Sequence, residues 1–171
     1  TGLDMTGSII YGTVEILNIA LSANDDVFTI ETTHSNVTNL FANSGADVIN
    51  VRTISGATTV NAGNGADTIN VGSLAQGSLA SRGNNSGGIV DGIAALLTVN
   101  GDAPTSFNSD ILNIDDTGDT NNNIGNLTST SISGLDMTGS ITYMTIETLN
   151  IDLSANDDVF TIESTHINVT N

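Results

Sequence analysis

The chain has 171 residues, of which 2 are basic and 19 acidic, so its net charge is −17. Phosphate contacts need several Lys and Arg side chains, so the composition excludes nucleic-acid binding of that kind and argues against docking on anionic membranes. With 38% hydrophobic but only 4% aromatic residues, the chain can bury a core built from small aliphatic side chains. The absence of cysteine excludes disulfides, thiolate metal sites and a cysteine nucleophile. The chain contains no run of 18 apolar residues, so no segment is predicted to span a membrane.

The first 39 residues recur at the end of the chain. Residues 1–39 align without a gap to residues 133–171, and 31 of the 39 pairs are identical. The offset of 132 residues predicts a tandem array, in which 1–132 form one full unit and 133–171 begin the next. The chain is therefore expected to be a piece of a longer protein that gains length from duplication.

A shorter period lies inside this unit. Short β-branched stretches alternate with stretches rich in Gly, Asn, Ser and Asp, which predicts strands joined by turns. Strands follow Asp26, Asp47, Asp67 and Asp110, which are 21, 20 and 43 residues apart. This spacing predicts an all-β fold, a parallel β-solenoid with coils of about 20–22 residues.

Apolar residues alternate with polar ones inside each strand, so one set should face the core. This set lies two and four residues after each aspartate, and Glu15 and Glu147 take the place of the aspartate before Leu17/Ile19 and Leu149/Ile151. Leu40 and Val60 on the return strands are expected to face the set across the core. The expected core ladder comprises Phe28, Ile30, Ile49, Val51, Ile69, Val71, Leu112 and Ile114.

The alternate positions should form a flat, uncharged outer stripe. One interpretation is a ladder of asparagines that stabilises the stack; the other is a lateral contact surface for another copy, a polysaccharide or, least favoured, ice. The stripe comprises Val27, Thr29, Val48, Asn50, Thr68, Asn70, Ile111 and Asn113.

Two stretches interrupt the period. Residues 72–109 are rich in small polar residues and are predicted to loop out or form weaker coils, with Pro104 in a turn. Within them, residues 88–99 fit either a short helix or a strand pair. Residues 115–131 are predicted to form a loop.

The turn AGNGADTIN at residues 62–70 resembles the nonapeptide G-G-x-G-x-D-x-U-x of RTX calcium-binding repeat proteins. Gly63, Gly65, Asp67 and Ile69 match this pattern, and Ala62 replaces its first glycine. Phrases such as LTVNG and DILNIDDTGD also resemble the long repeats of giant bacterial surface proteins. The resemblance implies a secreted protein whose turn carbonyls and aspartates bind calcium.

A physical reason supports calcium in such turns. Calcium takes six to eight oxygen ligands, glycine lets turn carbonyls point inward, and strands about 4.8 Å apart let neighbouring carboxylates share an ion. The alternative is that the aspartates cap turns by accepting backbone N–H groups. The expected metal-site residues are Asp26, Asp47, Gly63, Gly65, Asp67, Asp110 and Asp158.

Other chemistry-bearing residues are less specific. His34 and His166 occupy one repeat position and are expected in an exposed turn. The pairs Asp25–Asp26 and Asp157–Asp158 contain the carboxylates a glycosidase needs, but adjacent strand residues point to opposite faces. No catalytic residue is therefore assigned.

These observations favour an extracellular, non-enzymatic structural repeat of a very long bacterial surface protein, adhesin-like or fibre-like, with calcium as the expected cofactor. The alternative is a self-assembling filament or surface-layer subunit, and a β-helix polysaccharide-degrading enzyme is less favoured. The expected partners are neighbouring copies of the repeat, end-to-end or lateral, and a polysaccharide or cell surface.

Overall fold

The computed structural model describes residues 8–83, 86–102 and 110–171. The fold is all-β, with 14 strands and no helix among these residues, as the alternation predicts. The strands are β1 Ile16–Ala20, β2 Val27–Ile30, β3 Val37–Phe41, β4 Val48–Val51, β5 Thr58–Asn61, β6 Thr68–Val71, β7 Leu96–Asn100, β8 Ile111–Asp115, β9 Ile124–Leu127, β10 Ser131–Gly134, β11 Ser140–Met144, β12 Thr148–Asp152, β13 Val159–Ile162 and β14 Val169–Thr170.

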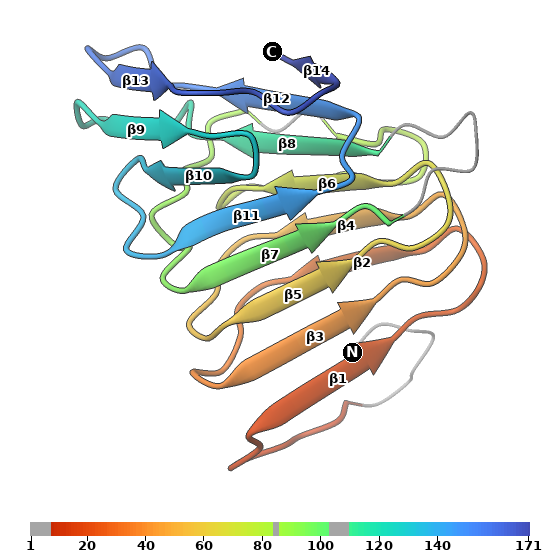
Figure 1. Ribbon diagram of the computed structural model, residues 1–171. Coiled ribbons are helices and arrows are strands. Elements are labelled where there is room, and N and C mark those ends of the chain that lie inside the picture. Colours follow the sequence, from red (N-terminus) through yellow and green to blue (C-terminus); the bar gives the residue numbers. More distant parts are fainter. Residues whose placement is uncertain (1–7, 84–85, 103–109) are drawn as a thin grey trace.

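The strands form two largely parallel sheets that face each other, and within each sheet the strands stack along the length of the molecule (Figure 1). The eight-stranded sheet has the order β1-β3-β5-β7-β11-β10-β9-β13, and the six-stranded sheet has the order β14-β12-β8-β6-β4-β2. From β1 to β8 the chain alternates between the sheets, so each of the strands β1 to β6 pairs in parallel with the strand two places later. This arrangement is compatible with a β-helix.

The core lies between the inner faces of the two sheets. The predicted ladder is confirmed: Phe28 packs against the core while half-buried, and the other seven residues are buried. Leu40 and Val60 are buried in the eight-stranded sheet, which faces this ladder, as predicted. Alternation of side chains along each strand therefore suffices to assign these residues to the interior.

The two copies of the 39-residue repeat lie in different sheets. Leu149 and Ile151 on β12 align with Leu112 and Ile114 on β8, as predicted. The prediction that Leu17 and Ile19 share that ladder is wrong, because β1 belongs to the eight-stranded sheet.

The cause of this exchange is a meander of three consecutive strands. β10 pairs antiparallel with both β9 and β11, so the chain stays in the eight-stranded sheet for three strands. It therefore crosses the core an odd number of times between β1 and β12. The predicted loop over 115–131 is wrong in part, because β9 lies within it.

Residues 72–83 fold back over the outer face of the six-stranded sheet. The N–H of Gly77 donates to Asn50 Oδ1 at 2.7 Å, and Asn70 Nδ2 donates to the carbonyl of Arg82 at 3.0 Å. As a result, the outward-facing residues of β4 and β6 are buried as well as the residues that face the core. Of the two interpretations of the outer stripe, a lateral contact surface therefore does not hold at Val48, Asn50, Thr68 and Asn70, which the chain itself covers.

The later part of the interrupting stretch returns to the stack. Strand β7 (Leu96–Asn100) begins within residues 88–99, so the helix that these residues also fitted is not formed. The turn expected around Pro104 lies outside the described residues.

Candidate functional site

Four of the predicted metal-site aspartates form a ladder at the start of the strands of the six-stranded sheet. Each residue donates its backbone N–H to the carboxylate one strand further along. The distances to Oδ1 are 2.7 Å for Asp26 to Asp47, 2.7 Å for Asp47 to Asp67, and 2.9 Å for Asp67 to Asp110. The N–H of Asp110 donates to Glu147 Oε2 at 2.7 Å, so the glutamate takes the aspartate's place as predicted.

Burial makes the ionised ladder costly. Asp47, Asp67 and Asp110 are at most 1% exposed. Desolvation raises the pKa of Asp67 and Asp110 to about 7 and also raises that of Asp47. The donated N–H groups lower these pKa values in part, and neighbouring carboxylates raise them. The ladder therefore takes up protons near neutral pH.

Arg82 supplies a positive charge beside the ladder. Its guanidinium donates to the carbonyls of Ala66 at 2.7 Å and Ala46 at 2.9 Å, the residues just before Asp67 and Asp47. This charge lowers the pKa of both aspartates. Arg82 thus occupies turn carbonyls of the kind that a calcium ion in these turns would use.

Gly63 and Gly65 allow the turn before Asp67 to stack closely on the turn before Asp47. A Cβ atom on Gly63 would overlap the carbonyl oxygen of Asn43, and one on Gly65 would overlap that of Gly45. Gly63 also has a φ of 94°, which favours glycine.

At the predicted calcium position between Asp47 and Asp67, most of the polar groups are therefore already hydrogen-bonded within the protein. The N–H of Asn64 donates to the carbonyl of Asn43 at 2.7 Å, and the N–H of Gly45 donates to the carbonyl of Asn64 at 2.9 Å. The Oδ2 atoms of Asp47 and Asp67 are buried without a hydrogen-bond partner. These two oxygens are available to a cation, whereas calcium takes six to eight.

Asp158 lies apart from the ladder, although it is the repeat counterpart of Asp26. It precedes β13 in the eight-stranded sheet, and its Oδ1 accepts the N–H of Asn123 at 2.9 Å. Its Oδ2 accepts the hydroxyl of Ser154 at 2.8 Å. The structure therefore does not bring the predicted metal-site residues to one place.

A second acidic cluster, which was not predicted, lies beside Asn123. Oxygens of Asp91, Asp116 and Asp119 lie within 4.8 Å of one another. Asn123 is 1% exposed, and its Nδ2 donates to Asp119 Oδ2 at 2.8 Å and to Asp116 Oδ2 at 3.3 Å. The sequence DDTGD at residues 115–119, which begins at the last residue of β8, contains Asp116 and Asp119, but nothing in the sequence places Asp91 next to them.

The spacing in this cluster suits a shared divalent cation. Oxygens that each lie 2.3–2.6 Å from a calcium ion are at most about 5 Å apart. Burial raises the pKa of Asp116 to about 6 and that of Asp91, whereas the N–H of Asn121 and the amide of Asn123 lower that of Asp119. Neither arginine pairs with the carboxylates of this cluster, because Arg82 binds the turn carbonyls and Arg52 pairs with Glu31.

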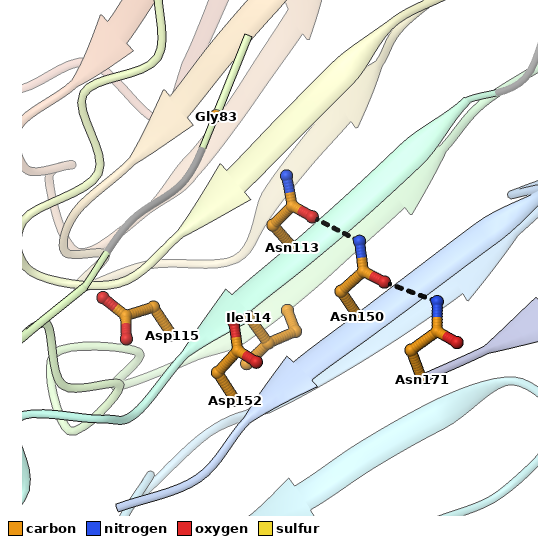
Figure 2. Close-up of a pocket in the computed structure, with 7 residues that line it drawn as sticks. All are labelled: Gly83, Asn113, Ile114, Asp115, Asn150, Asp152 and Asn171. Atoms are coloured by element: carbon orange, nitrogen blue, oxygen red, sulfur yellow. Dashed lines mark hydrogen bonds between the residues drawn. The ribbon is translucent and has the colours of Figure 1, made fainter. Parts of the chain in front are cut away.

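A continuous row of asparagine side chains, which begins at the hydroxyl of Thr29, crosses the outer face of the six-stranded sheet. Figure 2 shows its last three members, in which Asn150 donates to Asn113 at 2.8 Å and Asn171 donates to Asn150 at 2.9 Å. With Asp115 and Asp152 they line a hollow of about 240 Å³. Because each amide bonds the next, the row stabilises the stack, which was one of the two interpretations of the stripe. The full row comprises Thr29, Asn50, Asn70, Asn113, Asn150 and Asn171.

The remaining candidates stay separate. His34 contacts Tyr11 edge-on, and His166 contacts Tyr143 in the same way, each pair within its own copy of the repeat. Asp25 accepts the N–H of Ala46 at 2.7 Å and so serves the same turns as the ladder.

Comparisons with family models, with curated proteins and with solved structures found no match for this chain. The resemblance to RTX repeats therefore stays a prediction. Within the part of the chain that the structure describes, no helix is long and apolar enough to cross a membrane.

Proposed function

We propose that this chain is an extracellular, non-enzymatic structural repeat of a very long bacterial surface protein, and that its units join into one parallel β-solenoid. One observation carries the proposal. β12 and β13, the repeat counterparts of β1 and β2, stack on β8 and β9 of the first copy in parallel register. A unit that continues the stack of the unit before it adds length without a linker.

The exchange of sheets between copies supports an extended array. β1–β11 contribute seven strands to the eight-stranded sheet and four to the six-stranded sheet, so one unit alone lengthens one sheet more than the other. The next unit begins in the opposite sheet, so its meander would add the extra strands on the other side. Over two units each sheet gains 11 strands, which at about 4.8 Å per strand gives a length of about 26 Å per unit.

Calcium assistance is part of the proposal. The cluster of Asp91, Asp116 and Asp119 supports it, since three carboxylates meet there without a cationic side chain. A net charge of −17 further favours divalent cations around the folded chain. Secretion and adhesin-like display are inferred from the resemblance of residues 62–70 to RTX repeats.

Chains extended by one and by two further 132-residue units test the spacer function. Small-angle X-ray scattering should show a rod whose maximum dimension grows by about 26 Å per unit. A maximum dimension that does not increase, or that increases as for flexibly linked beads, would contradict the proposal.

Calcium titration tests the cation. Millimolar calcium should raise the melting temperature above its value in chelator, because a ligand that binds only the folded state stabilises it. The increase should be lost in Asp116→Asn and retained in Asp157→Asn, which removes an exposed carboxylate. Equal melting temperatures in calcium and chelator would remove calcium from the proposal and leave the spacer function standing.

A further inference from the structure

The loop between β8 and β9 holds the second copy of the repeat. Asn156 Nδ2 donates to the carbonyl of Asp119 at 2.9 Å. The N–H of Asn123 donates to Asp158 Oδ1 at 2.9 Å, and the N–H of Val159 donates to the carbonyl of Asn123 at 2.8 Å. These hydrogen bonds seat the turn before β13 on the loop, at the junction where β13 begins to pair with β9 (Figure 1).

The same loop carries the second acidic cluster. Asn123 Nδ2 donates to Asp119 Oδ2 at 2.8 Å and to Asp116 Oδ2 at 3.3 Å. The N–H of Val90, the residue before Asp91, donates to Asp116 Oδ1 at 3.1 Å and so ties the segment before β7 to the loop. Asn123 therefore contacts the second copy through its backbone and the cluster through its side chain.

The side chain of Asn123 is buried with one atom unpaired. The residue is 1% exposed, and among the residues that the structure describes its Oδ1 has no hydrogen-bond partner. Asp91 Oδ1 is likewise buried without a partner among these residues. A buried oxygen without a partner is costly, and a cation in the cluster would satisfy both oxygens.

A half-turn of the Asn123 amide would bring its oxygen to the cluster. Oδ1 and Nδ2 then exchange places, so the oxygen would stand where Nδ2 now lies, 2.8 Å and 3.3 Å from the two carboxylate oxygens. Two ligands that are each about 2.4 Å from a calcium ion are about 2.8–3.4 Å apart when they are neighbours in its coordination shell. Without an ion the carboxylates repel an oxygen at this place, which explains why Nδ2 faces them.

We propose that Asp91, Asp116, Asp119 and Asn123 bind one calcium ion at the junction, and that this ion fixes the loop on which the next unit is seated. The inference rests on the unit stacking and calcium assistance of the proposed function, and it adds the amide ligand and the role of the ion. All four residues lie outside the 39-residue repeat and inside the 132-residue unit. An array of identical units would therefore hold one such ion at each junction.

A matched pair of substitutions tests the amide ligand in the full chain. Asn123→Asp adds a fourth carboxylate to the cluster, so it should lower the melting temperature in chelator and enlarge the increase that calcium produces. Asn122→Asp adds the same charge one residue away and keeps an oxygen for the N–H of Asp157, so its increase should equal that of wild type. If Asn123 acts only as a hydrogen-bond donor, Asn123→Asp loses the same stability with and without calcium, and that result would overturn the proposal.

Titration calorimetry measures the ion directly. In a background of magnesium, calcium should still bind to a site that Asp91→Asn removes. Magnesium screens the net charge as calcium does, but it requires shorter distances and octahedral geometry. Calcium binding that magnesium abolishes, or that Asp91→Asn leaves unchanged, would contradict a built site.

Amide hydrogen exchange tests the role at the junction. Calcium should slow exchange of the Val159 N–H several-fold relative to chelator, because the loop that accepts it is then fixed. The N–H of Gly45, which bonds a neighbouring turn before β4, should change little. An equal change at both amides, or none at Val159, would refute the junction role. The parallel stacking of the units does not depend on the ion, so scattering from tandem chains would still report on the spacer function separately.

Discussion

Replacing Asp67 by Asn should remove much of the loss of stability that the protein suffers between pH 5 and pH 8. Burial raises the pKa of Asp67 from 3.8 to about 7 in the folded chain. Between these two pKa values, the folded chain holds one more proton than the unfolded chain. The free energy of unfolding therefore falls as the pH rises through this interval. Asparagine keeps an oxygen that can accept the N–H of Asp47, but it does not titrate.

The magnitude follows from the pKa. Each pH unit between 5 and 7 costs about 1.4 kcal/mol at one such site, so the wild-type chain should lose roughly 3 kcal/mol there. We expect the variant, relative to wild type, to gain this amount on going from pH 5 to pH 8. For a chain of this length, that corresponds to roughly 6–12 °C in melting temperature.

The comparison between two pH values separates the effect of the Asp67 charge on stability from the other effects of the substitution. Any constant cost of burying the new amide is the same at pH 5 and pH 8 and cancels in the difference. Urea unfolding of wild type, Asp67→Asn and the exposed control Asp157→Asn in chelator would measure it. A stability difference that is the same at both pH values, or one that favours wild type more at pH 8, would refute the reasoning about the ladder.

Leu149→Ala should cost about 3 kcal/mol in unfolding experiments and Leu17→Ala about 1 kcal/mol, because Leu149 is fully buried and Leu17 only half-buried; equal losses would contradict this difference in burial between the two repeat positions. Arg82→Gln should cost about 1–3 kcal/mol, and more at pH 8 than at pH 5, because the guanidinium offsets the ladder charge; a loss independent of pH would show that Arg82 acts only as a hydrogen-bond donor. Ile69→Asp should cost several kcal/mol, because it buries an unpaired charge in a fully enclosed site; a melting temperature equal to that of wild type would exclude the core register.

Much of the fold follows from local patterns in the sequence. The alternation of apolar residues after Asp47, Asp67 and Asp110 predicts both the strands and their buried faces, since a strand sends alternate side chains to opposite sides. The spacing of these aspartates predicts the ladder, and the repeat predicts that Glu147 joins it. These features need only the geometry of a strand and a regular offset.

The tertiary structure alone decides the rest. Whether a repeat copy enters one sheet or the other depends on how often the chain crosses the core, and the meander of β9, β10 and β11 changes that number without a periodic signal. The cover over β4 and β6 and the cluster around Asp91 likewise join residues far apart in the chain. Two segments with 31 identical pairs therefore differ in burial, because burial depends on which strands lie alongside a segment as well as on its own residues.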